Sequence, residues 1–590
     1  METVKRTFKC MHKISFFFIL SWVFITRWLY AQIPLSEIPN QTQYAAPVDF
    51  PILLSGNYGE IRATHFHTGI DIKTDQEEGR NILAADDGYV FRIVIQSKGY
   101  GKAIYLRHRS GQVTVYAHLR QFTPFVETYV KQNQYLLKSF EVDLYPEQDL
   151  FIFHKGELLG FSGNTGNSEA PHLHFEIRDQ SSSIPLNALE YGFDIRDITK
   201  PGISTLAVYP LDRDSRVNNV FEKLLVQPLK KNGHYILPVN TIQVNGSIGF
   251  GVETYDFLDN SPNECGPLSI SLFLDEKQIY LCRLDSIPFS QAGYVNSHID
   301  YEERIRSKKK IQKLYIDPNN RLSIYKVAVN RGILRLTDIS LHTVRIVIRD
   351  TYGNESFLTF NIQNSGLDTL PFDHEDDLAG TFIFRFDTLN VFEKEDIRII
   401  VPRNALFDNI DFQYTRIKSD SCPWSMVHQV HNEFTPLFKP YILSIRPSYL
   451  PVFLQTKSFI ASRGENGELI SHDGEYKSGY ITTKVKTFGQ FFVDVDTLNP
   501  VITPVNFNAG QRYAGNQTIS FRIVDLESGV RKYHGYIDKK WALFEYDAKN
   551  DLLNYSIDGD ILKENQSHEI EILVTDNKDN VTHFSSNFFY

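Results

Sequence analysis

The chain has 590 residues, 42% of them hydrophobic, and is therefore long enough for about four domains with buried cores. Its 61 basic and 71 acidic side chains give a formal net charge of -10. This balance argues against a nucleic-acid-binding role, because proteins that bind polyanions concentrate Lys and Arg on one face. The basic run at residues 304–310 is interpreted as a solvated strand end or loop.

Residues 1–31 have the pattern of an export signal peptide. Four lysines and arginines precede an apolar run from Ile14 to Ile25, and a cleavage point fits between Ala31 and Gln32. The run is shorter than the ~20 apolar residues that span a bilayer, and no later segment is long enough. We therefore expect no integral membrane span after signal removal. Retention of the segment as an anchor stays open, because Leu29 is larger than the residue usual at that position.

Short alternating runs punctuated by glycines occupy residues 40–200. They predict a compact antiparallel β domain with tight turns. The pattern is interrupted at about 123–140, where Thr123 can cap a helix and Pro124 can stand at its first position. We expect a helical insertion there, which either lines one wall of a substrate groove or serves only as a packing helix.

Two short motifs in this region hold candidate metal ligands. Alternate side chains of a strand share a face, so His172 and His174 should point the same way, about 6.6 Å apart, with one binding a metal and the other donating a hydrogen bond or carrying a proton. The same parity brings His67 and Asp71 together if residues 68–72 are extended. Two imidazoles and one carboxylate leave a fourth position for water, as in catalytic zinc sites.

A further alternating run predicts a strand that carries His118 on the same face as Tyr116. Three other histidines receive no role. His65 is an attractive extra ligand, but three protein ligands already suffice. His108 and His154 stand beside charged and turn residues and are interpreted as solvated.

Together these motifs resemble the lysostaphin-type (LytM-like) zinc metalloendopeptidases over about residues 45–200. The resemblance rests on four motifs: His67 with Asp71, residues 116–119 (YAHL), residues 160–166 (GFSGNTG) and residues 172–176 (HLHFE). It implies hydrolysis of a peptide bond in bacterial peptidoglycan, either in a stem peptide or in a cross-link. With long immunoglobulin-like tails, the chain is similar to Bacteroidetes members of the family, which implies export to the periplasm or cell surface.

The resemblance also implies a role for each candidate residue. His67, Asp71 and His174 match the family's zinc ligands, with one Zn²⁺ per chain. His118 and His172 match its two catalytic histidines that do not bind the metal. The ion would activate a water, one of these two imidazoles would take its proton, and the other would hold the developing oxyanion. The sequence does not decide between the two assignments.

The remainder of the chain predicts several β-sandwich modules, at residues 203–365, 377–497 and 500–590. Apolar alternation followed by Asp and Asn recurs at one constant offset in residues 344–354 and 570–580, and this echo resembles bacterial immunoglobulin-like modules. Acidic residues at turns of these modules are interpreted as solvated turn formers rather than calcium ligands.

Two further features of this part are simpler. Residues 499–504 are the best candidate for a linker, and residues 366–371 the next. Cys265 and Cys282 could form a disulfide or remain free and buried, and neither state bears on catalysis.

Two alternatives to a secreted endopeptidase remain from the sequence alone. One is a catalytically idle, metal-binding scaffold that activates another cell-wall hydrolase. The other is an adhesin or wall-binding protein in which the tail dominates. In every case the modules could act as spacers, dock to the wall or hold a cell-envelope protein partner.

Overall fold

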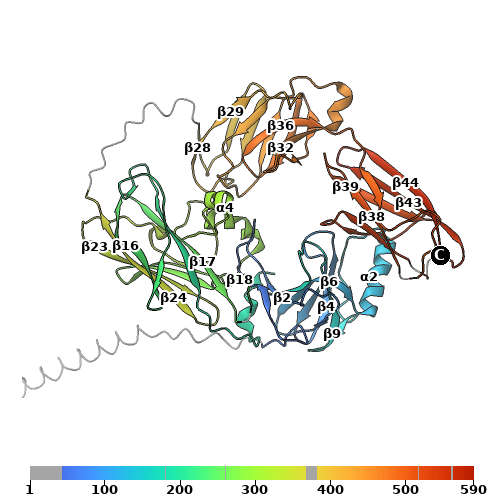
Figure 1. Cartoon of the computed structure of the whole chain (residues 1–590), viewed down its shortest axis with the longest axis horizontal. Helices are drawn as coiled ribbons and strands as arrows, with labels where there is room; N and C mark the ends of the chain where they lie inside the picture. The colour runs from blue at the N-terminus through green and yellow to red at the C-terminus, as the bar shows by residue number, and fades with distance from the viewer. Residues whose placement is uncertain are drawn as a thin grey trace, which may run out of the picture. The chain divides into compact units, whose positions relative to one another are not determined.

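The computed structural model describes residues 43–590, apart from residues 180, 182, 260, 367–381, 516, 558, 560 and 561. Strands dominate the described residues, and nearly all of their pairings are antiparallel (Figure 1). The predicted mainly β fold class is therefore confirmed. The predicted signal peptide at residues 1–31 lies outside the described residues. Within them, no helix is both long and apolar enough to cross a membrane.

An eleven-stranded sheet carries the candidate metal ligands, and its main path runs β1-β2-β10-β6-β5-β4-β7. Its strands are β1 (Leu54–Gly56), β2 (Ile70–Lys73), β3 (Asn81–Leu83), β4 (Gly88–Ile95), β5 (Lys102–His108), β6 (Gln112–Phe122), β7 (Val142–Leu144), β8 (Ile152–Phe153), β9 (Leu158–Ser162), β10 (His172–Asp179) and β11 (Pro185–Leu186). Ile70, Ile72, Leu173 and Phe175 are fully buried in the core beside it. Their burial determines which face of β2 and β10 remains for polar side chains.

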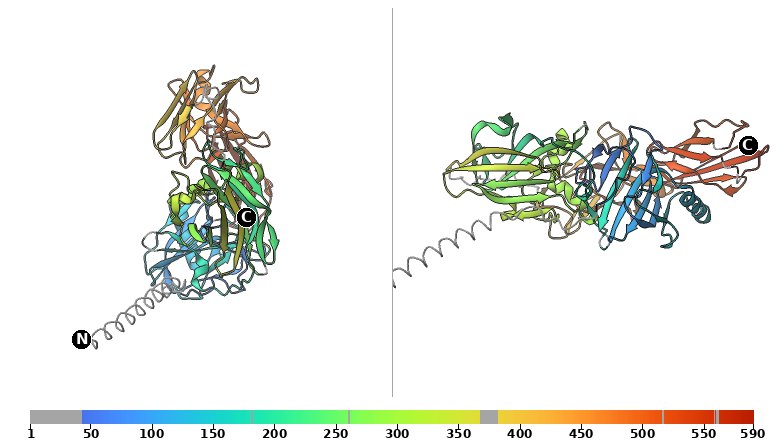
Figure 2. Two further views of the ribbon diagram at one scale, coloured as in Figure 1. Left: turned by 90° about the vertical axis from the view of Figure 1, so that its left-hand side faces the viewer. Right: turned by 90° about the horizontal axis from the view of Figure 1, so that it is seen from below.

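One helix, α2 (Pro124–Leu137), interrupts this region and lies alongside its sheet (Figure 1 and Figure 2). Thr123 stands at the N-cap position, but its side chain makes no capping hydrogen bond. Its carbonyl oxygen accepts from the backbone N–H of Glu127 at 2.9 Å. Val126 and Val130 are fully buried and join the core of the sheet, so apolar packing holds the helix in place.

Two sheets that share one hydrophobic core follow between residues 202 and 364. The five-stranded sheet consists of β12 (Gly202–Pro210), β14 (Leu224–Val226), β17 (Ile248–Phe257), β18 (Glu264–Cys265) and β21 (Gln312–Lys313). The eight-stranded sheet consists of β13 (Arg216–Val217), β15 (Leu229–Lys231), β16 (His234–Asn245), β19 (Ser269–Leu274), β20 (Lys277–Arg283), β22 (Tyr325–Ala328), β23 (Leu341–Arg349) and β24 (Glu355–Asn364). Short helices α3 (Val295–His298) and α4 (Tyr301–Ser307) connect strands of the two sheets.

A third region, between residues 382 and 495, packs around its own core. One five-stranded sheet has β26 (Asn390–Lys394), β27 (Ile397–Val401), β31 (Tyr441–Ile445), β34 (Glu475–Lys477) and β35 (Tyr480–Val485). The other has β29 (Tyr414–Ile417), β30 (Val427–Val430), β32 (Ser458–Arg463), β33 (Leu469–Ser471) and β36 (Gly489–Val495), and β25 (Phe382–Phe384) pairs with β28 (Ile410–Phe412).

Short 3-10 helices occur in several of the described regions. They are η1 (Ala188–Tyr191), η2 (Phe289–Tyr294), η3 (Val329–Gly332) and η4 (Val452–Lys457).

The last region consists of two four-stranded sheets around a fourth core. Its strands are β37 (Val501–Pro504), β38 (Thr518–Val524), β39 (Val530–Ile537), β40 (Lys540–Trp541), β41 (Glu545–Asp547), β42 (Leu552–Ser556), β43 (Ser567–Asp576) and β44 (Val581–Phe589). The linker predicted at residues 499–504 is wrong over its last four residues. Residues 501–504 form β37, which pairs with β38, because the backbone of even a Pro-flanked run can join a sheet at its edge.

The sequence echo corresponds to the same structural position in two modules. Residues 344–354 contain the end of β23 and the turn into β24, and residues 570–580 contain the end of β43 and the turn into β44. In both cases apolar alternation buries every second residue as far as Ile348 and Val574. Asp350 and Asn354 lie in the turn after β23, whereas Asp576 ends β43 and Asn580 lies in the turn after it.

Candidate metal centre

The register between β2 and β10 creates the candidate site. These strands pair antiparallel with His174 directly opposite Asp71 and His172 opposite Lys73. Directly opposed residues of a pair point to the same face, so the register alone puts a carboxylate beside an imidazole. On the opposite face, Leu173 and Phe175 are fully buried, as the alternation of the sequence predicted.

Three side-chain atoms converge at this point. His67 Nε2 lies 3.0 Å from Asp71 Oδ1 and 3.1 Å from His174 Nδ1, and His174 Nδ1 lies 2.9 Å from the same Asp71 oxygen. Each of the three residues is buried, and together they form a group of two imidazoles and one carboxylate that could hold a metal ion. His67 precedes the strand, since β2 begins only at Ile70, so the extended segment is shorter than predicted.

The outer nitrogen of each of these two imidazoles has its own hydrogen-bond acceptor. His67 Nδ1 lies 2.7 Å from the backbone oxygen of Asn57, and His174 Nε2 lies 2.9 Å from Glu176 Oε1. Each acceptor holds the proton on the outer nitrogen and leaves a lone pair on the nitrogen that faces Asp71. The tautomers and the donor set therefore fit a zinc ion, which takes neutral imidazole and carboxylate ligands.

A second layer of polar side chains, which the sequence analysis did not identify, supports this arrangement. Glu176 is fully buried and accepts hydrogen bonds from Tyr100 at 2.6 Å, from Thr68 at 2.7 Å and from Arg178 at 2.6 Å. Strand parity could have revealed it, because Glu176 follows His174 by two residues. Asp71 Oδ2 in turn accepts from Arg62 at 2.9 Å, a contact that no local pattern signals.

His118 reaches the site through a β-bulge. Between two register pairs, β6 advances three residues, from Tyr116 to Leu119, while β5 advances two. His118 there adopts a left-handed backbone conformation with φ of 61°. The prediction that His118 shares the face of Tyr116 is wrong, because Tyr116 packs on the core ring of Phe175 while the extra residue turns His118 toward His174.

The remaining two candidate histidines stand side by side next to the converging atoms. The ring centroids of His118 and His172 are 4.9 Å apart. His118 Nδ1 lies 2.8 Å from the backbone oxygen of Thr165, and His172 Nδ1 lies 2.8 Å from that of Ala170. His172 Nε2 is 3.5 Å from Asp71 Oδ1. Both rings are thus anchored through Nδ1, while Nε2 of His172 faces the Asp71 carboxylate.

The charges of the site are strongly coupled. Burial by itself would raise the pKa of the Asp71 carboxyl, but His67, His172 and His174 outweigh burial and hold it well below its usual range. Burial, together with the neighbouring His174 and His172, lowers the pKa of His118 to about 3. With no metal bound, His118 is therefore a neutral imidazole at neutral pH.

The other histidines and the cysteines have plainer environments. His65 is exposed and does not belong to the converging group, as expected. The prediction that His108 is solvated is wrong, because it is buried between the backbone oxygen of Asp87 and the hydroxyl of Thr114. The cysteines among the described residues are free and buried, so no disulfide joins Cys265 to Cys282.

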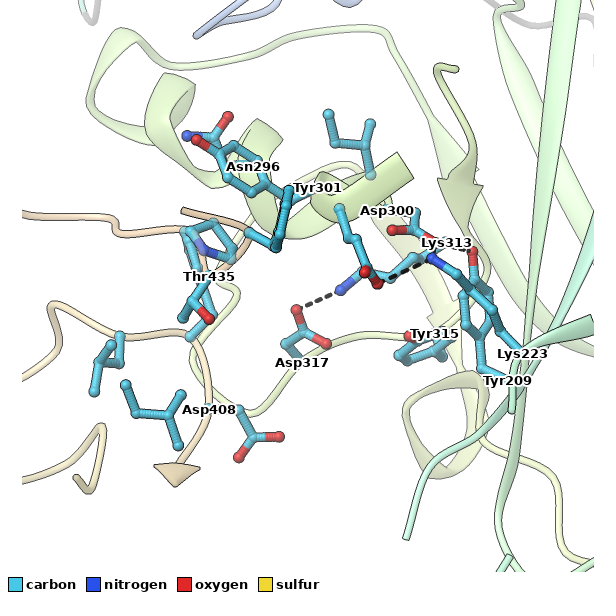
Figure 3. Close-up of a pocket in the computed structure, with 17 residues that line it drawn as sticks. Tyr209, Lys223, Asn296, Asp300, Tyr301, Lys313, Tyr315, Asp317, Asp408 and Thr435 are labelled. Carbon is cyan, nitrogen blue, oxygen red and sulfur yellow. Dashed lines mark hydrogen bonds and ion pairs between the residues drawn. The ribbon is translucent and has the colours of Figure 1, made fainter. Parts of the chain in front are cut away.

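A cavity of about 290 Å³ lies elsewhere, among residues 209–436 (Figure 3). Both lysines that line it are already paired: Lys223 Nζ lies 3.3 Å from Asp300 Oδ2, and Lys313 Nζ lies 2.6 Å from Asp317 Oδ2. None of the five predicted site residues lines it. The cavity therefore does not compete with the metal centre as the reactive site.

Comparison with known proteins identifies the class to which this centre belongs. Residues 65–141 match Peptidase family M23, and residues 381–496 match the Zu5-like domain. Residues 65–141 are therefore similar to the M23 metallopeptidases, in agreement with the motifs. The Zu5-like match gives the third β region a description that the sequence analysis lacked.

Individual relatives agree with this class. The chain is 30% identical over 155 residues to the DD-carboxypeptidase/endopeptidase Mpg of Neisseria meningitidis, a match over 26% of this chain and 29% of the relative. It is 34% identical over 119 residues to an uncharacterized metalloprotease of Haemophilus influenzae, covering 20% and 19% of the two chains. The chain thus spans less than a third of the length of the curated relatives it matches. The catalytic domain of lysostaphin from Staphylococcus simulans aligns at 21% identity and a TM-score of 0.18, over 24% of this chain and 91% of that one.

Proposed function

We propose that the chain is an exported, zinc-dependent endopeptidase that hydrolyses peptide bonds in bacterial peptidoglycan, within stem peptides or cross-links. The observation that carries the proposal is the convergence of His67 Nε2, Asp71 Oδ1 and His174 Nδ1 within 3.1 Å of one another, with two further imidazoles beside them. The relatives named as an endopeptidase and a metalloprotease support the same reaction class.

His67, Asp71 and His174 would hold one zinc ion per chain, and His118 and His172 would serve as the catalytic histidines. The bound ion would supply Lewis-acid polarisation and lower the pKa of a coordinated water. One of the two imidazoles would accept the proton of the attacking water at Nε2, and the other, in its protonated form, would donate a hydrogen bond from Nε2 to the oxyanion that develops on the substrate carbonyl. Their Nδ1 anchors, to Thr165 and Ala170, keep both rings in place during proton transfer.

The rest of the chain fits a secreted wall enzyme with accessory modules. We assign residues 1–31 to a signal peptide, residues 40–200 to the peptidase domain, and residues 203–365, 377–497 and 500–590 to β-sandwich modules. Action on peptidoglycan requires a location outside the cytoplasm, in the periplasm or at the cell surface. The modules would then position the peptidase on the wall or on a cell-envelope protein.

The decisive experiment compares zinc content and release of muropeptides from purified sacculi for the mature chain and three variants. We expect about one zinc per chain and peptide release for the wild type. His174→Ala should lose the metal, and His172→Ala should keep the metal but lose activity. His65→Ala is the matched control, since it removes an exposed imidazole two residues from a ligand and should change neither readout.

Two outcomes would contradict the proposal. If His174→Ala retains zinc, the ligand assignment is wrong. If the wild type binds zinc but releases no peptide from sacculi of several wall chemistries, the chain acts instead as a metal-binding scaffold for another hydrolase.

A further inference from the structure

A second group of converging acidic side chains lies outside the metal centre. Asp197, Asp256 and Asp350 offer carboxylate oxygens that lie within 4.8 Å of one another. All three are buried, with exposed fractions of 8%, 3% and 3%. Asp197 lies on the segment that enters β12, Asp256 on β17, and Asp350 directly after β23. Three distant parts of the sequence therefore bring negative charge to one buried point.

This charge has no counterion among the described residues. No Lys, Arg or His in that part of the chain forms an ion pair with any of the three aspartates. Oδ1 of Asp197 accepts from the backbone N–H of Thr199 at 2.9 Å, but its Oδ2 is buried without a hydrogen-bond partner. Burial, with Asp350 nearby, raises the pKa of Asp256 to about 7. An unpaired buried carboxylate oxygen of this kind is expensive unless a ligand satisfies it.

A second acidic group lies in the last module, where Asp496 is buried and Asp525 and Glu527 are partly buried. Asp496, Asp525 and Glu527 also offer oxygens within 4.8 Å of one another. Asp496 is fully buried and lies on the segment that enters β37, as Asp197 lies on the segment that enters β12. Its Oδ1 accepts from the backbone N–H of Leu498 at 3.0 Å, and its Oδ2 is again buried without a partner. The unsatisfied oxygen is thus repeated, not accidental.

The hairpin turns of the sequence echo contact the entering segment in both modules. Asn354 donates through Nδ2 to Asp350 at 2.7 Å and to the backbone oxygen of Asp197 at 3.2 Å. Asn580 does the same with Asp576, at 2.7 Å, and with the backbone oxygen of Asp496, at 3.2 Å. In each module the turn therefore holds the entering segment in the position that presents its free Oδ2.

The donor atoms indicate which cation would fit. Each group contains carboxylate oxygens and no imidazole or thiolate, which is the donor set of a hard cation such as Ca²⁺ rather than of Zn²⁺. We propose that the chain binds two Ca²⁺ ions, one held by Asp197, Asp256 and Asp350 and the other by Asp496, Asp525 and Glu527. Each ion would tie the segment that enters a β module to the strands of that module.

The proposal gives these acidic residues a role that their sequence pattern does not indicate. The interpretation of turn acids as solvated is wrong for Asp350 and Asp576, because both are buried at 3% and 0% exposure. Removing Ca²⁺ would leave the junctions at residues 197 and 496 with uncompensated charge. The expected dissociation constants are on the order of 10⁻⁴ to 10⁻³ M, the range of extracellular calcium modules.

The test is calorimetric titration of the zinc-loaded full chain with CaCl₂, together with thermal unfolding in the presence and absence of 5 mM CaCl₂. This concentration is several-fold above the expected dissociation constants of roughly 10⁻³ M or less. We expect about two Ca²⁺ per chain and a rise in the unfolding temperature. Asp197→Asn and Asp496→Asn should each remove one ion, and the double variant both. Asn keeps the shape and the Oδ1 hydrogen bond, so folding should survive, and circular dichroism verifies this. Asp420→Asn, which alters an exposed turn, is the matched control and should still bind two Ca²⁺ ions.

Several results would overturn the proposal. Absence of Ca²⁺ binding by the wild type at 5 mM rejects both sites, and unchanged stoichiometry in a folded variant rejects the site that it alters. Equal binding of Mg²⁺ at the same affinity rejects the choice of Ca²⁺. The result is independent of the proposed peptidase activity, because His174→Ala, which should lose zinc, should still bind two Ca²⁺.

Discussion

His174 lies directly opposite Asp71 across the β2–β10 pair, and its Nδ1 is 2.9 Å from the Asp71 Oδ1. A shift of β10 by one residue would move His174 to the core face. The buried side chains of Leu173 and Phe175 prevent such a shift, since it would bring them out of the core. Hydrophobic packing on one face of the sheet thus positions the ligands on the other.

Replacing the carboxylate that supports His174 should weaken metal binding without removing a ligand. Glu176→Gln removes the negative charge that holds the proton on His174 Nε2, 2.9 Å away. We expect the zinc affinity to fall by about 10- to 100-fold, as for other outer hydrogen-bond partners of metal-binding histidines. Competition with a chromophoric chelator measures this. Glu78→Gln, an exposed control, should leave the affinity unchanged, and equal affinities of the two variants would refute the role of Glu176.

A single methyl group at Gly69 should disturb the centre through the backbone. A Cβ atom there would lie 2.4 Å from the backbone oxygen of Phe175 and 3.0 Å from His174 Cε1. Gly69→Ala must therefore push β10 away from the segment that carries His67, and we expect a loss of about 1–3 kcal/mol in stability together with weaker zinc binding.

The control for this substitution is Gly266→Ala, where the nearest atom to the new Cβ would be 3.5 Å away, an ordinary contact. Urea unfolding and zinc titration of both variants provide the comparison. A Gly69→Ala protein as stable and as zinc-replete as Gly266→Ala would show that the close approach to β10 is relieved elsewhere.

The strained backbone of the bulge at His118 should affect the stability of the protein, and this effect can be measured even in variants that have lost activity. Its φ of 61° suits Gly but disfavours β-branched residues. Both His118→Gly and His118→Val remove the imidazole, so neither should cleave peptidoglycan. We expect His118→Val to be less stable than His118→Gly by about 1–3 kcal/mol, measured by denaturant unfolding. The opposite order would mean that residue 118 is extended in solution.

Acid should destabilise the module around His298 before it affects most carboxylates. His298 is fully buried beside Phe66, with Nε2 3.0 Å from Gln312 Oε1 and Nδ1 3.2 Å from the hydroxyl of Tyr325. Burial lowers its pKa to about 4; the hydrogen bond with Gln312 opposes the shift, and the nearby charge of Lys313 adds to it. The folded module therefore keeps this imidazole neutral at pH values where the unfolded chain is protonated.

The sign of the pH effect follows from this difference. Between pH 6.5 and about 4 the unfolded state binds the proton and the folded state does not, so stability is complete above pH 6.5 and falls as the pH drops. Between pH 7 and pH 5 the contribution lost is about 2 kcal/mol. His298→Gln should show a correspondingly smaller loss over this interval in urea unfolding. A pH profile identical to that of the wild type would contradict the assignment.

The sequence predicted much of the arrangement of the candidate site because its geometry is local. Alternation along a single strand puts His172 and His174 on one face, and the motif spacing links His67 to Asp71. The pattern of residues alone is therefore enough to identify these four side chains as candidates. The face of His118 could not be predicted, since a bulge depends on the register between β5 and β6 and leaves no mark in the run of residues. Burial of His108 depends equally on partners from other strands.

The acidic groups show a different limit of sequence interpretation. Asp350 and Asp576 each look like an ordinary turn residue, because their partners Asp197 and Asp496 are about 150 and 80 residues distant in the chain. The echo showed that the turns were equivalent, but only the fold shows that each turn meets the segment entering its module. Long-range convergence of this kind leaves no periodic signal.

The placement of Asp71 and His174 on paired strands has a consequence for how the protein acquires its metal. Because the backbone and the core already bring these two side chains together, the ligands are assembled before any ion arrives, unlike those of small domains that fold only around zinc. If the site binds zinc as proposed, the ion would be able to leave and return without unfolding the chain. The supply of zinc, rather than synthesis of new protein, would then determine what fraction of the existing molecules is active at any moment.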